Sequence, residues 1–430
     1  MMTDSNTRKF SVVSLFAGCG GMDIGFKQAG FDVIWANDIN KSACRTYSNN
    51  LGNHIYNADI KNIPLNEIPK ADVVIGGFPC QGFSIVGTRR LNDERNFLYQ
   101  SMKSVIHDKK PKFFVAENVK GLTNMEKGGI LETILQEFRD IGYTVDWRIL
   151  NAQDFGLPQH RERVFIIGNC IGAENLFPSP THGLIDENKI IQNSLFSFYN
   201  SLLMPYLTLR DAIGDIEELE TLPNHQIELF WKKRHPEWLK IMQHIGEGQK
   251  LCNIRLGERS VHTWNIPEVY GETSKIEREV LMAIAAHRRR KCYGKKDGNP
   301  LAFSDIFSLV KIKNLLEVLD LLVQKKYLVK IEDKFELKNS FNGLFRRLRW
   351  SQPSEAVLTV FNNPRHYVHP SQDRPFSVRE VARIQGFSDD FIFFGTLKDQ
   401  YTQIGNAVPP LLAKRIAEQI FYTLSKNTKK

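Results

Sequence analysis

Apolar and polar positions alternate in two different ways along the first 170 residues of this chain. Apolar runs of strand length predict buried strands at residues 9–18, 31–38, 71–77, 112–119, 144–151 and 163–169. Segments with apolar positions three or four residues apart predict intervening helices at residues 20–30, 41–50, 97–110 and 128–142. Strands alternating with helices predict an α/β fold with a mixed, mostly parallel sheet and helices on both faces.

The pattern changes after about residue 169, where loop-like and mixed signals replace the regular alternation. Helical periodicity returns at residues 274–291, 302–310 and 313–326, and residues 327–338 alternate like a hairpin. Three helices followed by a hairpin resemble a winged helix, a common nucleic-acid-binding module.

The end of the chain, at residues 376–387 and 403–424, is helical again and is expected to return to the first domain. The predicted boundaries are a first domain, a second region with a possible winged-helix-like part, and a returning C-terminal segment, at residues 1–175, 176–375 (with 275–340) and 376–430.

The composition, with 42% hydrophobic residues and a mean hydropathy of −0.31, is that of a soluble globular protein. The absence of a membrane-length apolar run and of an apolar signal core predicts a cytoplasmic protein without a membrane association. The six cysteines form no CxxC pair and no Cys/His cluster with zinc-ligand spacing, so no metal site is predicted. Free thiols in a reducing compartment leave a reactive thiolate available.

The net charge of +9 is concentrated in one part of the chain. Between Lys275 and Arg349 there are 18 Lys and Arg residues against nine Asp and Glu residues. Such a block fits a polyanion partner such as nucleic acid, and a solvated basic face fits it equally well.

The loop after the first predicted strand is rich in glycine, with Gly18, Gly20 and Gly21 before a helix. Glycines there let the backbone approach a ligand, although a bare tight turn explains them too. Asp38 ends the next strand, where it could bind ribose hydroxyls or cap the following helix. With Asp59 as an acceptor for an exocyclic amine, the set suggests an adenosine-containing ligand.

Four side chains at predicted strand ends could form a reactive site. Cys80 follows a buried strand and would be a nucleophile if its pKa were lowered, although a lone cysteine is more often inert. Glu117 ends another strand, where desolvation would help it to hold a proton. Arg161 and Arg163 lie on one face of an extended stretch, or form a surface ion pair with Glu162. This set suits attack on an electron-poor heterocycle.

The chain resembles the DNA (cytosine-5)-methyltransferases of bacterial restriction–modification systems. Six motifs occur in the family's order, covering the first 170 and the last 55 or so residues: "FAGCGG", "GGFPCQGFS", "AENV", "QHRERVF", "RPFSVREVARIQGF" and "QIGNAVPP". The resemblance implies a Rossmann-like S-adenosylmethionine-dependent catalytic domain and a smaller target-recognition domain.

By this resemblance, the Cys80 thiolate adds to C6 of a flipped-out cytosine and C5 then receives the methyl group. Glu117 would contact N3 and the exocyclic amine, and Arg161 and Arg163 would brace the base and the catalytic groups. The cofactor contacts implied by the family are Phe16, Gly18, Gly20, Gly21, Asp38, Ile39, Asp59, Ile60, Asn406 and Val408.

Contacts with double-stranded DNA are expected from two regions. The loop after Cys80 would close over the flipped base, although it could be an ordinary surface loop; its expected contacts are Gln81, Ser84, Arg89, Arg90 and Arg95. The second region resembles the family's final recognition segment, and its expected contacts are Arg346, Arg347, Arg349 and Thr359. The arginines could read guanines or contact only phosphates.

Two positions depart from the usual family pattern: Ser14 replaces an aspartate, and Asn96 replaces a glycine. Arg379 and Glu380 are expected to form buried structural pairs. The resemblance further implies a monomer that works with a cognate restriction endonuclease without a stable complex. Two alternatives to this function are an RNA cytosine-C5 methyltransferase and a catalytically silent DNA-binding regulator.

Overall fold

The computed structural model describes residues 9–79, 98–184, 203–216, 221–227, 229–294 and 298–428. The chain divides into two compact units. Unit 1 comprises Met1–Gln226, Trp350–Val360 and Ser377–Lys430, and unit 2 comprises Ile227–Arg349 and Phe361–Phe376. Each unit is built around its own apolar cores.

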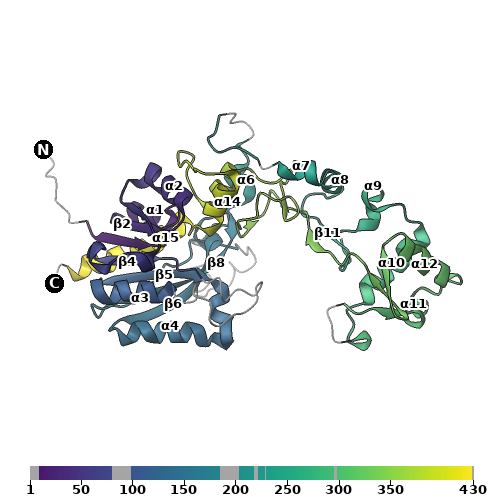
Figure 1. Cartoon of the computed structure of the whole chain (residues 1–430), viewed down its shortest axis with the longest axis horizontal. Helices are drawn as coiled ribbons and strands as arrows, with labels where there is room; N and C mark the ends of the chain where they lie inside the picture. Colours follow the sequence, from purple (N-terminus) through teal and green to yellow (C-terminus); the bar gives the residue numbers. More distant parts are fainter. Residues whose placement is uncertain are drawn as a thin grey trace, which may run out of the picture. The chain divides into compact units, whose positions relative to one another are not determined.

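A sheet of seven strands lies at the centre of the described part of unit 1 (Figure 1). Its strands are β1 (Ser11–Leu15), β2 (Asp32–Asp38), β3 (Ile55–Asn57), β4 (Val73–Gly76), β5 (Phe113–Val119), β6 (Thr144–Asn151) and β8 (Glu162–Asn169). Their order is β3-β2-β1-β4-β5-β8-β6, and β8 runs in the opposite direction to the other six strands. The predicted mixed, mostly parallel sheet is therefore confirmed.

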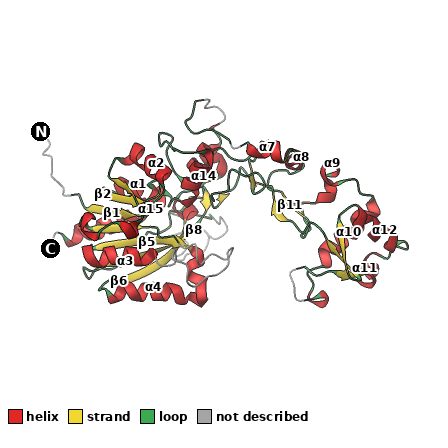
Figure 2. Cartoon of the chain, viewed as in Figure 1, coloured by secondary structure: helices red, strands yellow, loops and turns green. Residues whose placement is uncertain are grey.

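The strands are apolar on both faces because helices cover both sides of the sheet, as Figure 2 shows. The helices in the described ranges of unit 1 are α1 (Gly21–Gln28), α2 (Lys41–Leu51), α3 (Leu98–Lys109), α4 (Gly129–Asp140), α6 (Leu209–Ile213), α13 (Val378–Gln385), α14 (Leu397–Asn406) and α15 (Pro410–Asn427). Neighbouring residues of β4 point to opposite faces: Val73 and Ile75 join the core under α1 and α15, and Val74 joins the core under α3 and α4.

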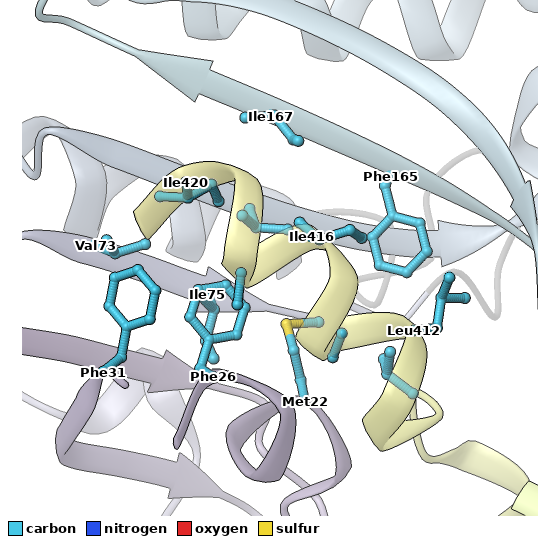
Figure 3. Packing of buried hydrophobic residues seen from close by; sticks show 14 of the residues in the cluster. Met22, Phe26, Phe31, Val73, Ile75, Phe165, Ile167, Leu412, Ile416 and Ile420 are labelled. Atoms are coloured by element: carbon cyan, nitrogen blue, oxygen red, sulfur yellow. The ribbon is translucent and has the colours of Figure 1, made fainter. Parts of the chain in front are cut away.

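The last helix, α15, covers the same sheet face as α1, although some 380 residues separate them in the sequence. Figure 3 shows Leu412, Ile416 and Ile420 of α15 among Phe26 of α1 and Phe165 of β8. These side chains are almost fully buried, and each fully buried apolar side chain contributes about 1.5–3 kcal/mol. The C-terminal segment therefore completes the first core.

Two small two-stranded sheets join distant parts of unit 1. They consist of β7 (Gln159–His160) with β18 (Ser354–Glu355), and β9 (His182–Gly183) with β10 (Met204–Pro205). The first of these pairs holds residues 350–360 beside the segment that precedes β8.

The described residues of unit 2 form two apolar cores. Around the first lie α7 (Phe230–Arg234), α8 (Glu237–Gln243), α9 (Pro267–Tyr270), β11 (Lys250–Cys252), β12 (Ser260–Val261), β16 (Asn342–Leu344), β17 (Arg346–Arg347) and β19 (Tyr367–Val368). Trp231 and Trp238 contribute the largest side chains of this core, and their rings stack at a centroid distance of 6.5 Å.

The second core of unit 2 has the arrangement of a winged helix. Its elements are α10 (Lys275–His287), β13 (Leu301–Ala302), α11 (Phe303–Val310), α12 (Leu315–Gln324), β14 (Leu328–Ile331) and β15 (Lys334–Leu337). The strands form a sheet in the order β13-β15-β14, and the predicted hairpin is the antiparallel pair of β14 and β15. A capping box of Ser274 with Glu277 fixes the start of α10.

The limits of the two units differ from the boundaries expected from the sequence. Unit 1 includes the described residues of 176–226 and residues 350–360, which the sequence pattern grouped with the second region. Composition alone misassigns these segments, because they bind to the predicted first domain. The Tyr206 hydroxyl donates to the carboxylate of Asp154 at 3.0 Å, and β18 pairs with β7. No helix in the described ranges has the length and apolarity that a membrane crossing requires.

Candidate active site

The carboxyl ends of β1, β2, β4 and β5 lie at one edge of the sheet, because parallel strands end on the same side. The chain order reverses between β1 and β4: β2 and β3 follow β1 in one direction, and β4 and β5 follow it in the other. In open α/β sheets, ligands bind beside such a reversal. The glycine loop and Glu117 both lie at this edge.

Different structural reasons explain why glycine occupies each of the three positions in the loop. A Cβ on Gly20 would lie 2.3 Å from Cδ1 of Leu51, and a Cβ on Gly21 would lie 2.3 Å from the carbonyl oxygen of Val408. These two glycines therefore allow close packing against neighbouring segments. Gly18, at φ +57°, has no described atom within 4 Å of its Cβ position, so it leaves open space at the strand end. Its positive φ also suits a tight turn, which the hydrogen bond from the Gly20 N–H to the carbonyl oxygen of Ala17 closes at 2.9 Å.

Asp38 fixes the glycine loop. Its carboxylate accepts hydrogen bonds from the backbone N–H of Gly18 and of Asn40, both at 2.8 Å. The N-cap of α2 is Asn40, whose side chain accepts from Ala43, so Asp38 does not have the capping role that the sequence left open. Burial raises the pKa of Asp38, while these backbone donors lower it.

The other residues expected at the cofactor differ in exposure. Ile39 is 69% exposed at the end of β2, and Asn406 is exposed at the end of α14. Ile60 is buried in the core, and Asp59 caps a short 3-10 helix by accepting from the backbone N–H of Lys61 at 3.0 Å. Phe16 is half-buried and lies beside that core with a φ of 55°.

A buried hydrogen-bond network that the sequence did not predict lies beneath the glycine loop. Asp23 of α1 accepts from Oγ of Ser14 at 3.0 Å and from the hydroxyl of Tyr47 at 2.9 Å. The Tyr47 hydroxyl also lies 2.9 Å from Nε2 of His54. Ser14 stands where the family usually has an aspartate, and Asp23 places a carboxylate next to this position. Polar residues on a helix give no sequence signal for such burial.

Burial is the largest influence on Asp23 and raises the pKa of its carboxyl group from 3.8 to about 6. The folded protein therefore binds this proton more tightly than the unfolded chain. Stability from protonation is full below pH 3.8 and is lost as the pH rises through about 6. Relative to Asp23→Asn, we expect the free energy of unfolding of the wild type to fall by about 3 kcal/mol across this range. Chemical unfolding of both proteins at several pH values measures the difference, and a constant difference would contradict the prediction.

Glu117 and Arg163 form a nearly buried ion pair at the carboxyl end of β5. Oε1 of Glu117 lies 3.0 Å from Nε of Arg163, and their side chains are 11% and 13% exposed. The strand register places Gly76 opposite Ala116, so Glu117 lies beside Gly77, where a Cβ would be 3.1 Å from Oε2. The backbone that leads toward residue 80 thus runs along the Glu117 carboxylate.

Burial raises the pKa of Glu117, while the positive charges of Arg163 and Arg161 lower it. Asn118, the next residue, donates from its side chain to the carbonyl oxygen of Phe78 at 3.0 Å. This bond ties β5 to the segment that follows β4. Cys80, Gln81, Ser84, Arg89, Arg90 and Arg95 lie outside the described residues.

Arg161 serves a different purpose from Arg163. It is 1% exposed, and its guanidinium donates to the carbonyl oxygens of Val357 at 2.5 Å, Gly405 at 2.9 Å and Ala407 at 3.1 Å. The alternative of a surface pair with Glu162 is wrong, because Glu162 pairs with Lys120 at 2.8 Å. Arg161 therefore holds two distant segments rather than a carboxylate.

Thr359 is exposed in unit 1 and lies against the "QIGNAVPP" segment. A Cβ on Gly405 would lie 2.5 Å from the backbone nitrogen of Thr359, so only glycine allows this approach. Arg379 is fully buried, but its guanidinium donates to backbone carbonyls, including that of Phe391 at 2.8 Å. Glu380 forms a capping box with Ser377. Both residues are structural, although their partners are mainly backbone groups.

Arg347 has a structural role in unit 2, which corrects its expected DNA contact. It is 6% exposed, and its guanidinium donates to the carbonyl oxygens of Met242, Ile245, His369 and Gln372 and to the carboxylate of Asp373. All three guanidinium nitrogens are thus engaged inside unit 2, and we omit Arg347 from the proposed DNA contacts. Arg346 lies over the ring of Tyr367 at 6.0 Å and is partly exposed.

Replacing Arg347 by alanine is expected to destabilise unit 2 by about 3–5 kcal/mol, since it leaves buried acceptors without a donor. Hydrogen exchange of the segments in unit 2 measures this loss. Arg346→Ala is the matched control, because its side chain is partly exposed. Unchanged exchange in Arg347→Ala together with weaker DNA binding would restore Arg347 as a DNA contact.

Comparison with known proteins shows which family has this sheet, glycine loop and acidic strand end. The family model of the C-5 cytosine-specific DNA methylases matches residues 10–422. The chain belongs to this family. The predicted class of enzyme, a DNA (cytosine-5)-methyltransferase, is thereby confirmed.

Bacterial relatives of this methylase match along nearly its whole length. It is 33% identical to the Type II methyltransferase M.AgeI of Thalassovita gelatinovora, over 96% of this chain and 99% of that protein. It is 31% identical to M.NgoFVII of Neisseria gonorrhoeae, over 99% and 90%, and 30% identical to M.BanI of Aneurinibacillus aneurinilyticus, over 96% of each. The predicted likeness to enzymes of restriction–modification systems is confirmed.

Solved structures agree with the methylase fold. A prophage-encoded DNA modification methyltransferase of E. coli covers 97% of this chain and 100% of its own, with a TM-score of 0.52 and 22% identity. The methyltransferase EhMeth of Entamoeba histolytica covers 97% and 99%, with a TM-score of 0.50 and 14% identity. At these identities the likeness concerns the fold alone.

Proposed function

We propose that this methylase transfers the methyl group of S-adenosyl-L-methionine to C5 of a flipped-out cytosine in duplex DNA, with Cys80 as the nucleophile. The observation that carries the proposal is the Glu117–Arg163 pair, which lies beside the backbone that leads to residue 80. A carboxyl group whose pKa is raised by burial suits the protonation or hydrogen bonding of cytosine N3.

In the proposed reaction, each bond that forms is matched by a bond that breaks, and no metal ion is needed. The Cys80 thiolate forms a bond to C6, and electron density moves to C5 while Glu117 stabilises the ring at N3. C5 then bonds to the methyl carbon as the bond between methyl and sulfur breaks. A base removes the C5 proton, the C6–sulfur bond breaks, and the aromatic ring and the thiolate are restored. Arg163 keeps the Glu117 carboxyl group oriented throughout.

The edge of the sheet near β1 and β2 fits the cofactor. Gly18 leaves open space, Asp38 holds the loop in place, and the exposed side chain of Ile39 offers an apolar surface for an adenine ring. Asn406 and Val408 would close over the methionine part, and Asp59 retains a second carboxylate oxygen for the exocyclic amine. When bound, S-adenosyl-L-methionine supplies an electrophilic methyl group on a sulfonium.

The target base must leave the duplex to reach this site, which costs a few kcal/mol of unstacking and unpairing. We propose that the loop containing Gln81, Ser84, Arg89, Arg90 and Arg95 closes over the base and contacts phosphates. The remaining proposed DNA contacts are Arg346 and Arg349 in unit 2 and Thr359 in unit 1.

The third helix of the winged-helix part, α12, is unsuited to contact phosphates because its charged side chains are acidic. The exposed residues of α12 include Glu317 and Asp320, together with Leu316 and Leu321. Acidic side chains repel phosphates, so any DNA contact by this part would come from elsewhere on it. Within residues 176–375, we propose that the part belonging to unit 2 carries most of the target recognition. This part is Ile227–Arg349 and Phe361–Phe376.

We further propose that the protein acts as a monomer in the cytoplasm and protects host DNA from a cognate restriction endonuclease. Its relatives named as Type II methyltransferases support this role. The RNA methyltransferase alternative has less support. The relatives that match nearly the whole chain, including unit 2, are named Type II methyltransferases.

Bisulfite sequencing of DNA from a methylation-free host that expresses the protein tests the proposal. We expect 5-methylcytosine at one recurrent sequence, which also reveals the recognition site. Transfer of tritiated methyl groups to duplex DNA and to tRNA completes the test. Label on tRNA alone would favour the RNA alternative, and label on neither would favour the silent regulator.

A further inference from the structure

Two buried glutamines outside the proposed chemistry, Gln159 and Gln385, hydrogen bond to each other. Nε2 of Gln159 donates to Oε1 of Gln385 at 2.7 Å and to the carbonyl oxygen of Ile384 at 3.0 Å. Gln159 belongs to β7, Gln385 ends α13, and neither side chain is exposed. Buried amides are costly unless their polar atoms find partners, so their remaining partners are informative.

The remaining polar atoms of the pair bind two segments that flank the site. Oε1 of Gln159 accepts from the backbone N–H of Val357 at 3.1 Å. Nε2 of Gln385 donates to the carbonyl oxygen of Ala407 at 2.6 Å. Val357 lies two residues before Thr359, the proposed base contact, and Ala407 lies between the two proposed cofactor contacts of the last motif.

Arg161 closes this path into a ring. Its guanidinium donates to the carbonyl oxygens of both Val357 and Ala407. The path therefore runs from Val357 through Gln159 and Gln385 to Ala407, and returns through Arg161 to Val357. Every member comes from unit 1, so the ring lies within one compact unit.

A ring of buried and partly buried hydrogen bonds restricts how its two ends move. Displacing Ala407 relative to Val357 would leave the buried side chains of Gln385 and Arg161 without one of their acceptors, which costs free energy. The close approach of Gly405 to the backbone nitrogen of Thr359 allows little slack between the same segments. Ordering the turn around Ala407 would therefore also order the segment that carries Thr359.

We propose that Gln159 and Gln385 are positioning residues that couple the cofactor side of the site to the target-base side. They touch neither ligand, and they act by fixing the backbone of Val357 relative to that of Ala407. This inference rests on the proposed function, because it takes Asn406 and Val408 as cofactor contacts and Thr359 as a base contact. Coupling between two binding sites is reciprocal, so it is measurable from either ligand.

The test uses Gln385→Met in the full-length protein. This change removes the link to Ala407, but Gln159 keeps Ile384 and Val357 as partners, and Ala407 keeps Arg161. The affinity for a duplex with the site found by bisulfite sequencing is measured with and without S-adenosyl-L-homocysteine. We expect S-adenosyl-L-homocysteine to tighten duplex binding by the wild type, and Gln385→Met to reduce that factor by about 2- to 30-fold.

Gln400→Met is the matched control, because Gln400 is also a buried amide of unit 1. It bonds to Gly395 and Asn224 and lies outside the ring. We expect this control to be less stable but to keep the wild-type coupling factor. A purely structural role for Gln385 predicts that the two variants behave alike.

The double variant Gln159→Met/Gln385→Met provides a second readout, since replacing both partners by apolar groups of similar shape can preserve stability. Wild-type coupling in either folded ring variant would overturn the inference while leaving the proposed function intact. A wild-type protein that binds neither S-adenosyl-L-homocysteine nor the duplex would instead overturn the proposed function.

Discussion

Replacing Glu117 by glutamine is expected to slow methyl transfer by about 100- to 10,000-fold, the usual contribution of a positioned acid or base. Glutamine keeps the shape of the side chain but cannot deliver a proton to cytosine N3. The amide oxygen of glutamine can still accept the hydrogen bond of Arg163, so we expect the variant to fold, although loss of the charge beside the nearly buried Arg163 lowers its stability. Single-turnover transfer of a tritiated methyl group to duplex DNA measures the effect.

The pH dependence of the rate separates proton transfer from simple misplacement of the base. Burial raises the pKa of Glu117, so the rate of the wild type should fall on the alkaline side as this group loses its proton. Glu117→Gln should lack that limb of the profile. Glu162→Gln is the matched control, because Glu162 pairs with Lys120, the residue that follows β5, and the variant is predicted to keep full activity. A Glu117→Gln variant with the wild-type rate and profile would rule out the assigned role.

Replacing Cys80 by alanine is expected to abolish methyl transfer and to leave cofactor binding largely intact. Without the thiolate no bond to C6 forms, and C5 of a neutral cytosine ring remains a poor nucleophile. Methyl transfer to duplex DNA and calorimetric titration with S-adenosyl-L-homocysteine measure the two properties separately. Any sustained turnover by Cys80→Ala would refute the covalent mechanism.

A substrate that cannot complete the reaction provides a direct test of the covalent step. Duplex DNA with 5-fluorocytosine at the target position should trap the wild type as an adduct stable on a denaturing gel, because fluorine cannot leave C5 as a proton does. Cys80→Ala should form no adduct. Cys170→Ala and Cys292→Ala are the matched controls, since both cysteines are exposed, and both variants should be trapped like the wild type.

The sequence pattern predicted the central fold well because its signals are local. Apolar runs such as the one containing Val73 and Ile75 are strands, since a buried parallel strand needs apolar residues on both faces. The position of Glu117 near a strand end followed from the same pattern. Glu117 directly follows the apolar run from Phe113 to Ala116 in β5. Its pairing with Arg163 requires only the adjacent strand β8.

Long-range hydrogen bonds escaped prediction because no local signal encodes them. The carbonyl groups bound by Arg161 lie at Val357, Gly405 and Ala407, about 200 residues or more away. A backbone carbonyl is present at every position, so sequence alone cannot identify which one an arginine reaches. Asp23 and Arg347 were hidden for the same reason, since burial of a charged side chain depends on tertiary packing.

The place of α15 on the sheet has a consequence for synthesis of the protein. Residues Leu412, Ile416 and Ile420 cover a sheet face whose strands have all left the ribosome some 240 residues earlier. Until the last helix arrives, Phe26, Ile75 and Phe165 on that face lack their final cover. Apolar surface exposed for this long favours association with chaperones or with other nascent chains. A chain truncated before Pro410 should therefore aggregate during expression, even though every strand of its main sheet is present.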